Sequence, residues 1–394
     1  MHEGSALEVF LSFLKLGLTS FGGPVAHIGY FREEIVVRRR WVDDATYTDL
    51  VALCQFLPGP ASSQVGFSLG LIRAGYWGAL AAWAGFTLPS AVLMTAFAYG
   101  ANALGSATGS GILHGLKLVA VAIVAQAVWG MAATLCPDRQ RASIACVAAV
   151  IVLSGNSSTA QIGVILMGGI AGFWLCRASA PTVSRPLGIP VSRRVGIVAL
   201  AAFFVLLAVL SVLGMRYRGF ELFDAFYRSG ALVFGGGHVV LPLLSKAFVT
   251  PGWVSQDSFL AGYGAAQAMP GPLFTFAAYL GAVGNHSPRG IAGAALGIAG
   301  IFLPGFLILL GALPFWDTLR QRIGARAIMR GINAAVVGLL GAALYGLLWV
   351  NAVGSSGDFA LALTGFVLLT AWRAPPVLVV ILGALGGIAL TQYV

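Results

Sequence analysis

The chain has 394 residues, of which 58% are hydrophobic and only 9% are charged. Roughly a quarter of the residues of a soluble globular domain carry a charge, so this composition excludes a water-soluble fold. The formal net charge is +10, but Lys and Arg lie in short clusters between apolar runs. That pattern sets membrane topology and does not indicate a nucleic-acid-binding surface.

Two short apolar pieces come first, Val9–Ser20 and Thr46–Leu57. Each has about 12 residues, or roughly 18 Å of helix, and is too short to cross a bilayer alone. The first piece ends at Phe21-Gly22-Gly23-Pro24 and the second at Pro58-Gly59-Pro60. Proline lacks an amide hydrogen, and glycine admits backbone conformations that other residues avoid. We therefore expect broken, re-entrant helix hairpins, two in each half of the chain.

Longer apolar stretches can cross the bilayer as single helices. A spanning helix needs about 20 largely apolar residues. The stretches are, in chain order, Tyr76–Gly100, Ile112–Cys136, Val195–Leu213, Gly290–Leu313 and Ile332–Val350. They are continuously apolar and rich in Gly and Ala, as packed membrane helices are, and lack the alternation of barrel strands. The sequence predicts an all-α polytopic membrane protein.

The second half of the chain repeats the first at a nearly constant spacing of about 212 residues. The matched segments are Phe21-Gly22-Gly23 with Phe234-Gly235-Gly236, Trp41-Val42 with Trp253-Val254, Gln55 to Pro60 with Gln267 to Pro272, and Leu88-Pro89 with Leu303-Pro304. We therefore expect a first repeat over residues 1–180, a linker with one transmembrane helix over 181–216, and a second repeat over 217–394.

Basic residues place equivalent loops of the two repeats on opposite sides of the membrane, because cytoplasmic loops are enriched in Lys and Arg. The loop Ala101–Gly111 has no Lys or Arg, whereas its counterpart in the second repeat contains Arg320 and Arg330. Conversely, the basic loop around Arg139 corresponds to Asn351–Asp358, which has none. The repeats are therefore predicted to be inverted. Inverted repeats are common in secondary transporters, whose substrate lies near the midplane where the repeats meet.

The breaks are the predicted substrate site. A half-helix N-terminus presents free amides and a positive dipole end, which together bind anions. Lipid cannot satisfy such a backbone, so it must be buried in protein or line a wet cavity. The candidate backbone positions are Gly22, Gly23, Gly59, Gly235, Gly236, Gly237 and Gly271.

Two cations, Lys15 and Arg228, occupy equivalent positions inside apolar segments. An ionisable group there is costly and is by default a functional hypothesis. We expect them to bind substrate; the alternatives are ion pairs with Glu8 and Glu221 or extension of the side chains to the interface.

Other polar residues lie close to the breaks. Gln55 and Gln267 precede the Pro-Gly-Pro sequences by three residues and could donate to oxyanion oxygens or satisfy broken backbone. His238, like His27, follows a glycine run, where it could contact substrate or cap backbone. Glu33 and Glu34, among several arginines, are predicted to form a solvated interfacial face.

The sequence lacks the residue motifs that enzyme chemistry would need. There is no HExxH, GxSxG or P-loop motif, and the four cysteines form no CxxC pair. We predict no catalytic residue, no metal site and no cofactor, and expect transport to draw on an ion gradient or on exchange.

The motifs resemble those of the chromate ion transporter family in its long, two-domain form. The resemblance rests on the first-half motifs Phe21-Gly22-Gly23-Pro24 and Gln55 to Pro60, and on the longer second-half strings Val233 to Pro242 and Gln267 to Phe274. It covers nearly the whole chain. Pro24 stands where the family more often has a third glycine, which leaves open whether the two half-sites bind equally.

The resemblance implies a multi-pass protein of a bacterial or archaeal cytoplasmic (inner) membrane that exports chromate and confers chromate resistance, with sulfate as competitor. Its partners would be chromate or a sulfate-like oxyanion and the lipid bilayer, with no nucleic acid. Uptake or exchange of sulfate or another oxyanion on the same scaffold, as by an antiporter, and an uncoupled anion channel remain alternatives. A homodimer is left open.

Overall fold

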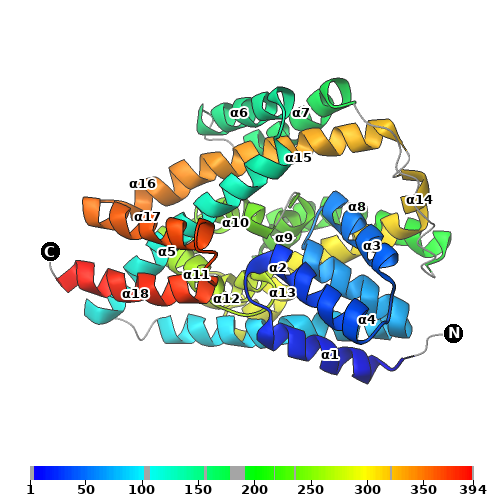
Figure 1. Ribbon diagram of the computed structural model, residues 1–394, viewed down its shortest axis with the longest axis horizontal. Helices are drawn as coiled ribbons and strands as arrows, with labels where there is room; N and C mark the ends of the chain where they lie inside the picture. Colours follow the sequence, from blue (N-terminus) through cyan, green and yellow to red (C-terminus); the bar gives the residue numbers. More distant parts are fainter. Residues whose placement is uncertain are drawn as a thin grey trace. The chain divides into compact units, whose positions relative to one another are not determined.

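A computed structural model describes residues 4–101, 107–154, 158–177, 191–216, 218–234, 237–319 and 322–392. Every regular element in these ranges is a helix, which confirms the all-α prediction (Figure 1). Within them, five helices are long and apolar enough to cross a membrane. They are Ala61–Gly100, Gly109–Leu135, Arg193–Gly214, Gly290–Leu319 and Ile323–Ala352. Gly235, Gly236, Arg320, most of the loop 101–111 and linker residues 178–190 lie outside the described residues.

The helices of the first half follow the predicted order. They are α1 (Ala6–Thr19), α2 (Gly23–Phe31), the π-helical η1 (Arg32–Arg38), α3 (Asp44–Phe56), α4 (Ala61–Ala101), α5 (Ala107–Leu135), α6 (Arg139–Ser154) and α7 (Ser158–Leu175). The linker helix is α8 (Arg193–Arg216). All five predicted spanning stretches, here and in the second half, are helical.

The second half contains α9 (Arg218–Ala231), η2 (Gly237–Val239), α10 (Val240–Phe248), α11 (Gln256–Ala266), η3 (Leu273–Thr275), α12 (Phe276–Val283) and α13 (Gly290–Ala312). It continues with η4 (Leu313–Phe315), α14 (Trp316–Leu319), α15 (Ile323–Ala343), η5 (Leu344–Trp349), α16 (Val350–Ala352), α17 (Ser356–Thr370) and α18 (Pro376–Gln392).

The predicted breaks are present, and glycine conformation explains them. Gly22 precedes α2 with φ of 97°, and Gly59 and Gly271 have φ of 120° and 93°. These left-handed values are routine for glycine and costly for other residues. Helix α4 is itself interrupted at Ala74 and Gly75, where φ of Gly75 is 65°. The segment after Pro58-Gly59-Pro60 is therefore a short half-helix, followed by the longer predicted span.

The chain forms two compact units, and neither unit is a repeat. One unit comprises Met1–Tyr99, Val183–Gly237 and Met269–Asp317; the other comprises Gly100–Thr182, His238–Ala268 and Thr318–Val394. Each unit thus takes segments from both halves of the chain. The helix breaks at residues 22–23, 59, 237 and 271 all belong to the first unit.

Within the first unit, equivalent helices of the two repeats pack in the same way. Gly17 of α1 lies against backbone carbonyls of Gly85 and Phe86 in α4. Its counterpart, Gly230 of α9, lies against the carbonyl of Ile301 in α13. Small residues at these crossings let the two backbones approach closely, as is typical of membrane helix pairs.

The second unit shows the same repetition. Helix α15, orange in Figure 1, packs along α6 and α7, and α5 packs along α17 and α18. Gly331 of α15 contacts the backbone of Gly168 in α7, and Gly115 of α5 contacts that of Gly383 in α18. The internal repeat read from the sequence is therefore also a repeat of helix packing.

Candidate functional site

The Pro-Gly-Pro break of each repeat is hydrogen-bonded to the end of the first half-helix of the other repeat. The amide of Gly59 donates to the carbonyl of Val233 at 2.7 Å, and the amide of Gly271 donates to the carbonyl of Ser20 at 2.9 Å. Ser20 and Val233 each immediately precede the Phe-Gly-Gly sequence of their repeat. The two bonds are therefore equivalent, and they cross between the repeats.

Further contacts bring the breaks of the first unit together. A Cβ atom built at Gly237 would lie 3.2 Å from Cγ of Pro24, which follows the glycine pair of the first repeat. A Cβ atom built at Gly271 would lie 2.9 Å from Ser90 Oγ, and one built at Gly59 would lie 2.9 Å from the Cα of Gly305. The structure thus gathers Gly22, Gly23, Gly59, Gly237 and Gly271 in one region of the first unit.

Gln64 is a residue that the sequence argument missed. Its side chain is fully buried, and its Nε2 donates to the carbonyls of Pro58 at 2.9 Å and Gly305 at 2.8 Å. One amide group thereby satisfies a carbonyl at the first-repeat break and ties it to α13 of the second repeat. Its position, four residues after Pro60 in the first turns of a helix, was the available signal.

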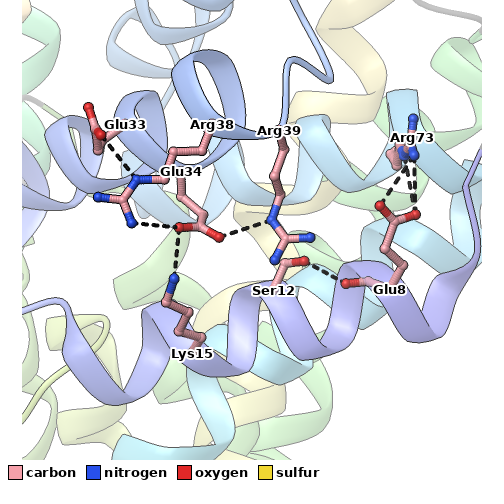
Figure 2. Close-up of polar contacts among 8 residues, drawn as sticks. All are labelled: Glu8, Ser12, Lys15, Glu33, Glu34, Arg38, Arg39 and Arg73. Carbon is pink, nitrogen blue, oxygen red and sulfur yellow. Dashed lines mark hydrogen bonds and ion pairs between the residues drawn. The ribbon is translucent and has the colours of Figure 1, made fainter.

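The two predicted cations each contact a carboxylate. Lys15 Nζ lies 2.9 Å from Glu34 Oε2, and Arg228 Nε lies 2.9 Å from Asp224 Oδ1. Glu8, the alternative partner expected for Lys15, instead pairs with Arg73 at 3.2 Å (Figure 2). The Lys15 and Arg228 side chains are 54% and 44% exposed, so neither cation is enclosed by the protein.

Glu34 is the centre of a cationic cluster, and its predicted place on a solvated face is wrong. Its side chain is buried and lies near three cations: Lys15, Arg39 at 3.0 Å, and Arg38 at 3.9 Å (Figure 2). The π-helical segment η1 turns Glu34 toward α1, while its neighbour Glu33 stays exposed. Burial alone would raise the pKa of the Glu34 carboxyl, but hydrogen bonds from Lys15 and Arg39 outweigh it and hold the pKa below its usual value.

The remaining predicted side chains differ in their surroundings. Gln55 is exposed at the end of α3. Gln267 interacts with Tyr263, whose hydroxyl also contacts Nδ1 of His238 at 2.8 Å. His27 is buried, contacts Ser62 Oγ at 3.4 Å and hydrogen-bonds the Ser20 backbone. His27 therefore lies among the breaks, whereas His238 and Gln267 form a group of their own with Tyr263.

The chromate transporter family matches this chain over residues 7–173 and again over residues 220–388. The chain belongs to this family. The double match coincides with the two repeats, so this member of the chromate transporter family is a multi-pass membrane transporter and not an enzyme. No group of three His, Cys, Asp or Glu side chains among its described residues could hold a metal ion.

Similar proteins span nearly the whole chain. A chromate transport protein of Pseudomonas aeruginosa is 29% identical, covering 96% of this chain and 90% of the relative. A chromate transport protein of Cupriavidus metallidurans is 26% identical, covering 91% of this chain and 86% of the relative. An uncharacterized transporter of Methanocaldococcus jannaschii is 28% identical, covering 86% of this chain and 83% of the relative. No solved structure matches the chain.

The glycine conformation at the first break can be tested on α2. A Cβ atom at Gly23 or at Gly29 would meet no atom within 4 Å, but only Gly23 has a positive φ, of 78°. Gly23→Ala should therefore lower the free energy of unfolding by about 1–2 kcal/mol through backbone strain. Gly29→Ala should not lower the free energy of unfolding. Thermal melting of both detergent-solubilised variants, monitored by size exclusion, measures these changes in stability. Equal melting temperatures of the two variants would contradict the role given to Gly23.

The Glu34 cluster should make stability depend on pH. Because the folded pKa of Glu34 lies below its ordinary value of 4.5, the cluster stabilises the protein above that pH and weakens as the pH falls through the lower, folded value. Glu34→Gln should cost about 1–2 kcal/mol at pH 7 and flatten the melting temperature between pH 6 and 3. Glu33→Gln is the exposed control and should keep the wild-type profile; identical profiles for both variants would rule out this role of Glu34.

Proposed function

We propose that this protein is a secondary transporter that exports chromate from the cytoplasm and so confers chromate resistance, with sulfate as a competing oxyanion. The observation that carries the proposal is the crossed pair of hydrogen bonds, Gly59 to Val233 and Gly271 to Ser20, which brings breaks of both repeats to one place. Substrate sites of inverted-repeat transporters lie where broken helices of the two repeats meet. The names of the bacterial relatives support chromate as the cargo.

The site is suited to a tetrahedral dianion. Half-helix N-termini supply amides with a positive dipole end, and Lys15 and Arg228 supply one cation from each repeat. Each cation already contacts a carboxylate, Glu34 or Asp224. An arriving dianion would compete with that carboxylate for the cation, and Glu34 would keep its contact with Arg39 when Lys15 turns to the substrate.

The proposed topology keeps the boundaries 1–180, 181–216 and 217–394 and places the protein in the cytoplasmic membrane with its basic loops inside. The linker helix α8 would then provide the odd crossing that inverts the second repeat. One contact supports the sidedness: His114 Nε2 lies 2.6 Å from Asp358 Oδ1. His114 follows the loop 101–111 and Asp358 ends the loop 351–358, and both loops are predicted to face outward. A homodimer would carry two copies of the site.

Chromate flux across vesicles tests the proposal. Inverted membrane vesicles containing the protein should accumulate chromate under an imposed pH or sulfate gradient, without ATP, and excess sulfate should inhibit. Acceleration by sulfate on the opposite side would identify exchange, and a current without a coupling ion would identify a channel. Absence of protein-dependent chromate movement in either vesicle orientation would refute chromate transport.

The paired cations should matter through their charge. Lys15→Gln and Arg228→Gln should each weaken chromate or sulfate binding by about 1.5–3 kcal/mol, roughly tenfold to hundredfold. Arg228→Lys should retain part of the affinity that Arg228→Gln loses, because charge is kept while the fork geometry is not. Arg32→Gln, which removes an exposed cation paired with Asp44, is the control. Unchanged affinity in both Gln variants at the candidate positions would make Lys15 and Arg228 structural residues.

A further inference from the structure

Six buried polar residues of the first repeat lie around the breaks, and five of their counterparts in the second repeat are Val, Phe or Gly. The pairs, first repeat before second, are Ser20 and Val233, Ser62 and Phe274, Ser63 and Thr275, Gln64 and Phe276, Thr87 and Phe302, and Ser90 and Gly305. All six of the first-repeat residues are buried. The two half-sites are therefore chemically different although their backbones break in the same way.

These residues are connected around the break at Gly271. The Ser20 carbonyl accepts the Gly271 amide at 2.9 Å, and the Ser90 hydroxyl lies beside Gly271. The ring of His27 links the Ser20 backbone to Ser62 Oγ. Ser62 and Ser63 occupy the first turn of α4. The end of α1 and the beginning of α4 thus share one polar environment in the first unit.

The first turn of α4 has amide donors that the hydrogen bonds of the helix itself do not use. The first helical hydrogen bond of α4 runs from the amide of Gln64 to the carbonyl of Pro60 at 2.9 Å. The amides of residues 61–63 lie before that bond, outside the hydrogen-bond ladder of the helix, at its positive dipole end. An N-terminus alone would not distinguish α4 from other helices of the protein.

Buried hydroxyls supply the second observation. Ser20 and Ser63 are 0% and 2% exposed, and their Oγ atoms have no hydrogen-bond partner among the residues that the structure describes. Serine and threonine in membrane helices usually donate to a carbonyl of the preceding turn, as Ser12 and Thr95 do here. A buried polar group without a partner is costly and points to a ligand or water that is bound during function.

We propose that the oxyanion is coordinated at the N-terminus of α4, by the amides of residues 61–63 and the hydroxyls of Ser20, Ser62 and Ser63. This inference rests on the proposed function and specifies which half-site holds the anion. An unprotonated tetrahedral dianion accepts hydrogen bonds and donates none, so amides and hydroxyls suit it. These neutral donors would coordinate the oxygens of the anion, while Lys15 and Arg228 remain its proposed counter-charges.

The second repeat provides a matched control. Thr275, the counterpart of Ser63, is buried, but its hydroxyl already donates to the carbonyl of Pro272 at 2.8 Å. Equilibrium binding of chromate and of sulfate to the purified full-length protein in detergent should fall at least about tenfold in a Ser62→Ala, Ser63→Ala double variant. Ser63→Thr, which keeps the hydroxyl, should retain most of the affinity, and Thr275→Ala should remain within about twofold of wild type.

The outcomes separate the two proposals. If wild-type protein binds chromate or sulfate and the double variant binds equally well, the α4 site is refuted while the transport function stands. If wild-type protein binds neither anion, the proposed function fails and the α4 site fails with it. Should the double variant not elute as a folded protein, Ser20→Ala decides in its place. A several-fold loss of affinity there supports the site, and wild-type affinity overturns it.

Discussion

A backbone amide released from a helix inside a membrane must find its hydrogen-bond acceptor within the protein, because lipid provides none. In this structure the amides of Gly59 and Gly271 find theirs on the opposite repeat, at Val233 and Ser20. The other repeat therefore helps to stabilise each break. The site and the association of the two repeats depend on the same pair of bonds, which explains why one compact unit contains breaks from both halves of the chain.

Several charged side chains of the described residues form ion pairs. Lys15 and Arg228 are balanced by Glu34 and Asp224, and the buried Glu34 also holds Arg39. Paired charges cost less inside an apolar environment than isolated ones, so these carboxylates lower the cost of keeping Lys15 and Arg228 in otherwise apolar segments.

The two half-sites show how duplication can leave a symmetric scaffold with unequal chemistry. Glycine positions at the breaks and at helix crossings are preserved between repeats because the backbone geometry requires them. Side chains that do not set backbone geometry were free to diverge: Ser62, Gln64 and Thr87 of the first repeat correspond to Phe274, Phe276 and Phe302 of the second. Such a difference would let one repeat coordinate the anion while the other packs and moves around it.

The sequence by itself determined the helices, the breaks and the repeat, because apolar length, glycine and proline act locally on the backbone. It also identified Lys15, Arg228 and the break glycines as candidates, since charge and glycine stand out in apolar segments. Only the tertiary structure decided that Glu34 is buried against Lys15, that Gln64 joins two repeats, and that each unit mixes both halves. These features depend on contacts between residues far apart in the chain, and periodicity and composition carry no information about such partners.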